Sequence, residues 1–209
     1  MFRAVFLDLD DTLFDRTAAV RRWAAATLPE LDEAGERWLL ACDARGRRSR
    51  LDFATDLVAR FQLTTRAEVL ASAFPLQLAS HVEREVGVRE QVARLAIQTR
   101  VAIVSNGSGA AQRMKLRRLG LDQLVHAVFI SGELSIAKPD PEMFQRALRW
   151  SGQAAADCLF VGDDPVNDIA PAAALGFATA WRERDAWPSE LPPPTHRLAS
   201  IAALEQVCA

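Results

Sequence analysis

Three carboxylates follow an apolar run near the start of the chain. Residues 4–7 are apolar, and Asp8, Asp10 and Asp11 occupy three of the next four positions. A run that is apolar on both faces is typical of a buried parallel strand, and ligands bind beyond the carboxyl ends of such strands. Because residues two apart on an extended chain point the same way, we expect Asp8 and Asp10 to reach one site. Neighbouring carboxylates share a proton or hold a cation, and hard oxygen ligands suit Mg2+. A solvated turn is the plainer alternative.

Polar side chains also follow two later apolar runs. They are Ser105 and Asn106 after residues 101–104, and Asp163, Asp164 and Asp168 after residues 158–161. A hydroxyl, an amide and the N–H groups of a helix N-terminus suit an anionic phosphoryl group. Lys138 precedes a predicted helix and offers a compact charge to a phosphate and to a carboxylate. Taken singly, each of these residues also has a purely structural explanation. Ser105 and Asn106 could cap the following helix, Lys138 could be a solvated surface lysine, and Asp168 could be an acid in the first turn of a helix.

The elements that must bring these residues together alternate along the chain. Strand-like runs lie at residues 4–7, 101–104, 127–130, 158–161 and 177–181, and helical patterns lie at 109–119, 141–150 and 166–175. This alternation predicts right-handed crossovers and an α/β fold with a doubly wound, mostly parallel sheet. The proline-rich residues 183–197 predict an extended loop, and residues 199–207 predict a closing helix.

Residues 16–86 break this alternation. They contain helical stretches at about 17–28, 31–45, 50–61 and 66–82. Apolar stripes on these stretches predict an inserted helical bundle. The expected domains are therefore an α/β core of residues 1–15 and 87–209 and a helical insert of residues 16–86. Gly87 is a candidate hinge, and we expect the insert to act as a lid over the catalytic crevice.

Composition argues against several classes of function. The chain has 209 residues and a net charge of -2, so no overall basic field indicates nucleic-acid binding. Three distant cysteines, Cys42, Cys158 and Cys208, argue against a disulfide framework or a zinc site. No apolar run approaches the ~20 residues that cross a bilayer, and no leader pattern follows Met1. We expect a cytoplasmic protein that binds neither nucleic acid nor membranes.

The ordered motifs resemble those of the haloacid dehalogenase-like (HAD) hydrolase superfamily, in the subfamily with a helical cap between the first two motifs. The matching positions are Asp8, Asp10 and Thr12 in D-x-D-x-T, Ser105 in the second motif, Lys138 in the third, and Gly162, Asp163 and Asp168 in the fourth. The motifs keep the family's order and span nearly the whole chain. The resemblance implies a Rossmann-like core, with residues 16–86 as the cap.

The resemblance also implies a two-step phosphoryl transfer. Asp8 attacks phosphorus and becomes an aspartyl phosphate. Asp10 protonates the leaving oxygen and then activates water. Mg2+ is implied between the Asp8 carboxylate, the backbone carbonyl of Asp10, and Asp163. Asp168 is expected to order metal-bound waters or the third-motif lysine, and whether Asp164 binds the metal stays open.

Phosphate binding is implied for Thr12, Ser105, the backbone of Asn106, and Lys138, which is also expected to be catalytic. Thr12 has the alternative of a hydrogen bond within its own turn. Arginines at positions 45, 47, 48 and 50 suggest an anion site in the insert, but runs of like charge are more often solvated loops.

The leading hypothesis from the sequence is a Mg2+-dependent phosphatase for a small phosphorylated metabolite, acting as a monomer or homodimer. A haloacid dehalogenase needs neither a metal nor a second acid, so Asp10 and the cluster of Asp163 and Asp168 favour phosphoryl chemistry. A sugar-phosphate mutase shares all four motifs and stays open, as does a non-catalytic binding protein on the same fold. The sequence leaves the physiological substrate undetermined.

Overall fold

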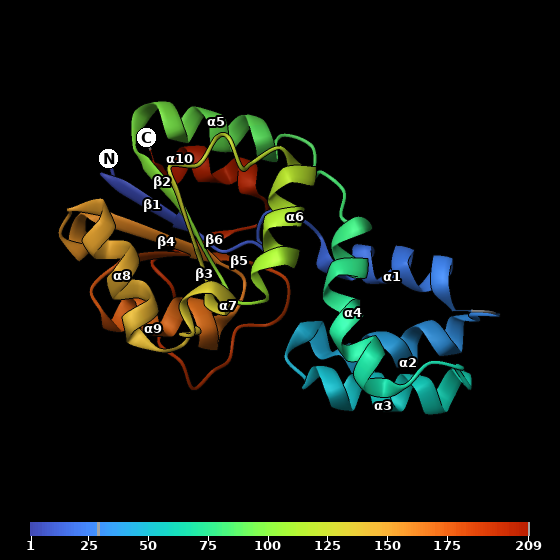
Figure 1. The fold of residues 1–209 in the computed structure, drawn as a ribbon. Coiled ribbons are helices and arrows are strands. Elements are labelled where there is room, and N and C mark those ends of the chain that lie inside the picture. Colours follow the sequence, from blue (N-terminus) through green and yellow to red (C-terminus); the bar gives the residue numbers. More distant parts are fainter. Residues whose placement is uncertain (29, 209) are drawn as a thin grey trace. The chain divides into compact units, whose positions relative to one another are not determined.

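The computed structural model describes residues 1–28 and 30–208 (Figure 1). The chain divides into two compact units, which we call the core unit (Met1–Phe14 with Arg84–Ala209) and the helical unit (Asp15–Glu83). Within the described ranges, no helix is long and apolar enough to cross a membrane.

A six-stranded parallel sheet runs through the core unit in the order β3-β2-β1-β4-β5-β6. Its strands are β1 (Ala4–Leu7), β2 (Arg100–Ser105), β3 (Ala127–Ile130), β4 (Cys158–Gly162), β5 (Ala178–Arg182) and β6 (His196–Leu198). The predicted α/β class and the first five strands are confirmed. The prediction of a loop through residues 196–197 is wrong, because the open edge of β5 supplies backbone partners that pair Ala180 with His196 and Arg182 with Leu198.

Strand β1 lies at the centre of the sheet because both of its faces are apolar. It pairs with β2 on one side and β4 on the other, and all four of its residues are buried. The amide of Asp8 donates to the carbonyl of Val161 at 2.9 Å, which extends the ladder one residue beyond β1. Asp8 therefore stands at the carboxyl edge of the two central strands.

Helices cover both faces of this sheet. They are α5 (Val88–Gln98), α6 (Gly109–Leu119), α7 (Ser131–Leu134), α8 (Pro141–Ser151), α9 (Ala170–Ala174) and α10 (Leu204–Cys208). Helices α8 and α9 pack on one face through a cluster that includes Phe6, Phe144 and Phe160, and α5 and α10 lie together on the other (Figure 1). The sequence pattern missed α5, and the predicted helix at 166–175 is a π-helical turn, Pro165–Ile169, followed by α9.

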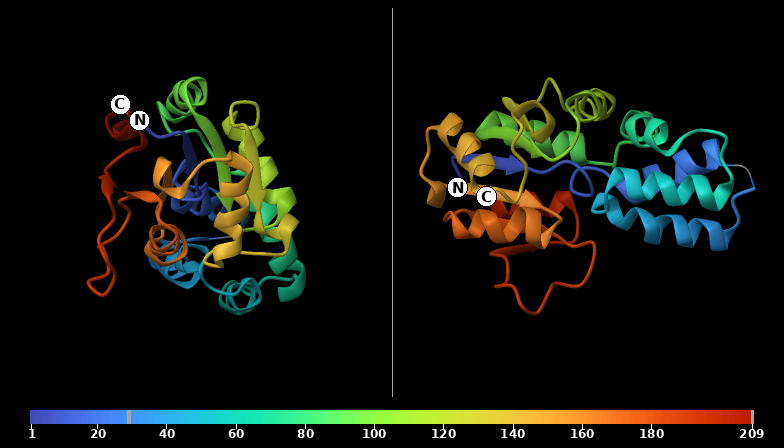
Figure 2. Two further views of the ribbon diagram at one scale, coloured as in Figure 1. Left: turned by 90° about the vertical axis from the view of Figure 1, so that its left-hand side faces the viewer. Right: turned by 60° about the horizontal axis from the view of Figure 1, so that its bottom comes forward.

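The helical unit contains α1 (Arg16–Thr27), α2 (Glu33–Asp43), α3 (Arg50–Phe61) and α4 (Ala67–Ser80), which pack against one another (Figure 2). Ring contacts fill its interior, with centroids 4.8 Å apart for Trp23 and Phe74 and 5.0 Å apart for Phe53 and Phe74. The core unit resumes at Arg84, and Glu85 accepts hydrogen bonds from Arg182 at the end of β5 and from Arg184 just beyond it.

Candidate active site

A buried charged cluster lies beyond the ends of β1 and β4. The ammonium of Lys138 donates to Asp8 Oδ1 at 2.6 Å, to Asp168 Oδ1 at 2.6 Å and to the carbonyl of Val104 at 2.9 Å. A lysine ammonium carries three N–H groups, so protein acceptors use all of them. Lys138 is only 5% exposed. The lysine therefore holds the Asp8 carboxylate in a fixed position, although the two residues are 130 positions apart in sequence.

The electrostatics of this cluster favour additional positive charge. Burial raises the pKa of Asp8 to about 7, although Lys138 acts in the opposite direction. Burial also raises the pKa of Asp168. For Lys138, burial lowers the pKa, but the carboxylates of Asp168 and Asp8 outweigh it and raise the pKa above its ordinary value. The lysine thus stays charged, and a further cation would favour the ionised carboxylates.

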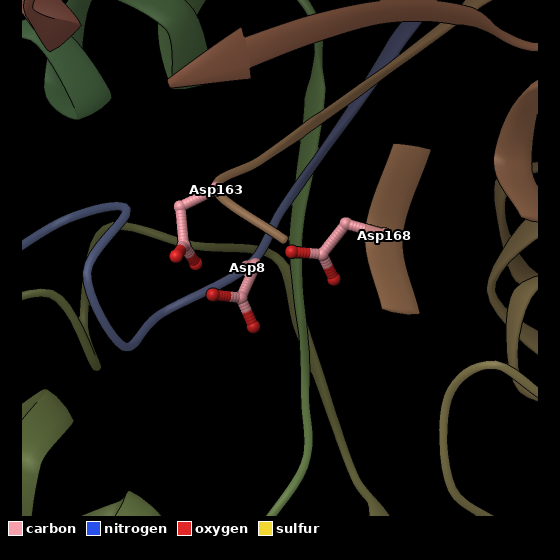
Figure 3. A group of neighbouring side chains, drawn as sticks. All are labelled: Asp8, Asp163 and Asp168. Atoms are coloured by element: carbon pink, nitrogen blue, oxygen red, sulfur yellow. The ribbon is translucent and has the colours of Figure 1, made fainter. Parts of the chain in front are cut away.

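Three buried carboxylates face one another at this edge of the sheet. Oxygen atoms of Asp8, Asp163 and Asp168 lie within 4.8 Å of one another, and Figure 3 shows the three side chains turned inward. Trp181 donates its indole N–H to the backbone carbonyl of Asp163 at 2.8 Å, which holds the loop after β4 in place. Several carboxylate oxygens in a buried site suit a hard divalent cation. The residues present therefore fit a divalent metal ion.

The turn after β4 separates the roles of its two later aspartates. The Asp164 carboxylate caps the π-helical turn by accepting from the backbone N–H groups of Val166 at 2.9 Å and Asn167 at 3.1 Å. Asp168 points back to the sheet, so that a Cβ on Gly162 would lie 2.4 Å from Asp168 Oδ2. Only glycine permits this approach. In the part of the chain that the structure describes, the facing carboxylates include Asp168 and not Asp164.

The turn of the first motif also holds the candidate nucleophile. Thr12 donates its hydroxyl to Asp8 Oδ2 at 3.1 Å and lies 3.5 Å from Asp163 Oδ1. Asp11 has a φ of +58°, and Arg184 donates to its carbonyl at 2.8 Å. Lys138 and Thr12 together contact both carboxylate oxygens of Asp8, which fixes the plane of that carboxylate.

Ser105 and Asn106 do not cap the helix that follows them. Ser108 is the N-cap of α6, and its hydroxyl accepts from the first turn of the helix. The Asn106 amide donates to the backbone carbonyl of Lys138 at 2.8 Å and accepts from its N–H at 2.9 Å. Ser105 is buried close by, at the end of β2. The capping alternative is therefore wrong, and Asn106 orients the loop that carries Lys138.

Two residues of α6 that the sequence analysis missed contact Asp10. Lys115 donates to Asp10 Oδ1 at 2.6 Å, and Gln112 donates to Asp10 Oδ2 at 2.7 Å. Gln112 also donates to the hydroxyl of Ser105 at 2.7 Å. Both α6 residues are buried among the apolar positions of the helix. Polar residues three apart on an otherwise apolar helix face were the signal that could have identified them.

The arginines at positions 45, 47, 48 and 50 belong to the helical unit, and two of them form ion pairs within it. Arg48 Nη2 lies 2.6 Å from Asp56 Oδ2, and Arg50 Nη1 lies 3.5 Å from Asp43 Oδ1. Asp43 also forms a buried ion pair with Arg16. These ion pairs stabilise the connection between α2 and α3.

Comparisons with known proteins agree with the geometry. A family model described as haloacid dehalogenase-like hydrolase matches residues 2–176. Glyceraldehyde 3-phosphate phosphatase of Pyrococcus abyssi is 26% identical over 193 residues, which cover 87% of this chain and 81% of that protein. Phosphoserine phosphatase of Thermus thermophilus is 38% identical over 90 residues, which cover 43% of this chain and only 36% of that protein.

Solved structures share the fold at lower identity. The HAD-hydrolase YfnB from Bacillus subtilis, solved bound to magnesium, is 21% identical with a TM-score of 0.84 and covers 99% of this chain and 98% of its own. L-2-haloacid dehalogenase from Xanthobacter autotrophicus is 19% identical with a TM-score of 0.78 and covers 100% of this chain and 98% of its own. Because the family model matches most of the chain, this protein belongs to the haloacid dehalogenase-like hydrolase family.

Proposed function

We propose that this chain is a Mg2+-dependent phosphatase that hydrolyses a small phosphomonoester through an aspartyl phosphate on Asp8. The observation that carries the proposal is the buried cluster of Asp8, Asp163 and Asp168, with the Lys138 ammonium against Asp8. Family membership supports hydrolysis, and the two curated relatives described above are named as phosphatases.

In this proposal Asp8, Asp163 and the backbone carbonyl of Asp10 would hold Mg2+. When bound, Mg2+ offsets the negative charge that would otherwise keep a carboxylate nucleophile from a phosphate. Asp168 forms an ion pair with Lys138, so we assign it to fixing that lysine. We assign Asp164 to capping the π-helical turn, because its carboxylate accepts from the backbone N–H of Val166.

The first step is attack by an Asp8 oxygen on phosphorus. Thr12 and Lys138 each contact one Asp8 oxygen, so each oxygen keeps a second lone pair, of which one would serve the metal and the other would attack phosphorus. The bond from Asp8 to phosphorus forms as the ester bond breaks, and Asp10 gives its proton to the leaving oxygen. In the second step water gives a proton to Asp10 and attacks phosphorus. The acyl phosphate bond then breaks and inorganic phosphate is released.

The transferred phosphoryl group is held by the end of β2 in this scheme. The Ser105 oxygen accepts from Gln112, and its own O–H makes only a long 3.5 Å contact with the carbonyl of Asn106, from which it would turn to donate to a phosphoryl oxygen. The backbone of Asn106 lies beside it at the end of the strand. Because the N–H groups of Lys138 are used by protein acceptors, we assign its effect on the phosphate to its charge.

We further propose that the helical unit selects the substrate, as the cap of this family would. The net charge of -2 supports a small metabolite over nucleic acid, and we propose cytoplasmic action as a monomer or homodimer. Three facing carboxylates do not support the alternative of a metal-free haloacid dehalogenase. A sugar-phosphate mutase stays a second candidate because it would use the same residues.

The decisive experiment traps the intermediate. The protein is mixed with p-nitrophenyl phosphate and Mg2+ and quenched in acid, and its peptides are analysed by mass spectrometry. We expect phosphate on Asp8, loss of turnover in Asp8→Asn and in chelator, and normal turnover in the exposed control Asp122→Asn. Phosphate on Ser105, or full turnover in chelator, would contradict the proposal. Conversion of a sugar phosphate without phosphate release would favour the mutase.

A further inference from the structure

Lysine is rare in this chain, and both lysines lie at the candidate site. Of 25 lysine and arginine residues, only Lys115 and Lys138 are lysines. Lys138 contacts Asp8 and Lys115 contacts Asp10, each at 2.6 Å. Both lysines are buried, and a lysine ammonium is a compact point charge with three rotatable donors. Each catalytic aspartate of the first motif therefore has its own buried lysine.

We infer that Lys115 and Gln112 are positioning residues that hold the Asp10 carboxylate in the orientation needed for proton transfer. The inference rests on the proposed function, because it concerns the acid–base step of that reaction. It goes beyond the family motifs, since neither residue belongs to them.

The contacts fix the orientation of the Asp10 side chain. Lys115 binds Oδ1 and Gln112 binds Oδ2, so both oxygens are held and the plane of the carboxylate is set. The Asp10 side chain is 22% exposed, whereas the Lys115 side chain is 7% exposed. A partly exposed carboxylate would otherwise rotate about two side-chain bonds, and fixing those rotations before reaction lowers the barrier.

Gln112 joins the acid–base residue to the phosphate-binding end of β2. Its Nε2 lies 2.7 Å from Asp10 Oδ2, 2.7 Å from Ser105 Oγ and 2.9 Å from the carbonyl of Asn106. One amide nitrogen therefore sets the spacing between the group that moves the proton and the group that holds the phosphoryl oxygens.

The two contacts leave Asp10 able to react. A carboxylate has about four lone-pair sites, and Lys115 and Gln112 use one on each oxygen. These two contacts by themselves therefore do not use the full acceptor capacity of the carboxylate. Lys115 is itself held from a second side, because its Nζ lies 5.6 Å over the ring of Phe14, which forms a backbone bridge with Asp10.

The test separates the two chemical steps by quenched-flow kinetics with p-nitrophenyl phosphate. Nitrophenolate leaves without a proton, so phosphoenzyme formation does not need Asp10 as an acid, whereas hydrolysis still needs it as a base. In Lys115→Met and Gln112→Leu we expect hydrolysis of the phosphoenzyme to slow by about 100-fold, as a displacement of about 1 Å can cause. In Lys115→Met, formation of the phosphoenzyme and kcat/KM should change less than about threefold, because neither depends on the hydrolysis step.

Two further variants complete the design. Lys115→Arg keeps the charge and should recover part of the lost hydrolysis rate. Arg117→Met removes a cation from the exposed side of the same helix and should leave both rates unchanged. Equal slowing of both steps in Lys115→Met, or a hydrolysis rate within about threefold of the wild type, would overturn the inference. If chelator did not reduce turnover by the wild-type protein, that result would instead contradict the proposed function.

A spectroscopic measurement tests the contact without turnover. Protein labelled with 15N-lysine contains only two side-chain ammonium groups, those of Lys115 and Lys138. We expect Asp10→Asn to shift the Lys115 signal and Asp8→Asn to shift the Lys138 signal more strongly. A Lys115 signal that is the same in Asp10→Asn and wild-type protein would show that the contact is absent and would overturn the inference.

Discussion

Replacing Lys138 with methionine is expected to destabilise the metal-free protein, and to do so more at pH 8 than at pH 5.5. Methionine has a similar length but no charge. The substitution removes the ammonium that donates to Asp8 and Asp168 at 2.6 Å and to the carbonyl of Val104 at 2.9 Å. Two buried carboxylates then lose the same cation.

The expected magnitude follows from the burial of this cluster. Removing one partner of a buried ion pair costs about 3–5 kcal/mol, because the other charge stays desolvated. Oxygens of Asp8 and Asp168 lie within 4.8 Å of each other, so protonation of one carboxylate relieves repulsion on the other and the two losses do not simply add. We therefore expect the free energy of unfolding at pH 8 to fall by about 4 kcal/mol, out of the ~5–15 kcal/mol typical of a folded protein.

The pH dependence follows from the raised pKa values. Burial raises the pKa of Asp8 to about 7 and also raises that of Asp168. Lys138 lowers the pKa of both carboxyl groups, so its loss raises both pKa values further. Between the ordinary carboxyl value of about 4 and the raised value, the folded protein binds more protons than the unfolded chain, so its stability increases as pH falls. The destabilisation caused by the substitution should therefore shrink toward pH 5.5.

Urea denaturation in chelator at the two pH values measures this effect, with tryptophan fluorescence as the signal. Arg117→Met, which removes an exposed cation from α6, is the control for a general loss of positive charge. A loss below about 1 kcal/mol at pH 8 would place Lys138 in the range of a surface ion pair. That result, or an equal loss at both pH values, would refute the reasoning.

Three further predictions concern the metal, its loop and the helical unit. Because the pKa of Asp8 is about 7, Mg2+ affinity measured by calorimetry should rise about tenfold per pH unit below pH 7 and level off above it; Asp8→Asn should lose this slope. Trp181→Phe removes the donor to the Asp163 carbonyl and should raise the Mg2+ concentration for half-maximal activity at least about tenfold, and an unchanged requirement would count against that contact. Replacing residues 16–83 with a short linker should preserve hydrolysis of p-nitrophenyl phosphate but flatten the ranking of natural phosphomonoesters in an activity panel; an unchanged ranking would place specificity in the core unit.

The sequence alone determined the α/β class and the principal site candidates. The apolar residues 4–7 predict a buried central strand, and Asp8 follows directly from that assignment because the strand ends there. The ends of β2 and β4 are defined in the same way by apolar runs that stop at Ser105 and Asp163. Such assignments succeed because burial on both faces of a strand leaves a strong local pattern.

The tertiary structure decided which polar groups contact one another. Asp164 and Asp168 are both acids near one turn, but Asp168 alone packs against Gly162 and receives a hydrogen bond from Lys138, which directs it to the cluster. Gln112 and Lys115 stay hidden in sequence because their partners lie about a hundred positions away. Strand β6 likewise depends on the open edge of β5. In each case the stabilising contact is with a residue that is distant in sequence and that only folding brings near. A local sequence pattern therefore cannot predict that contact.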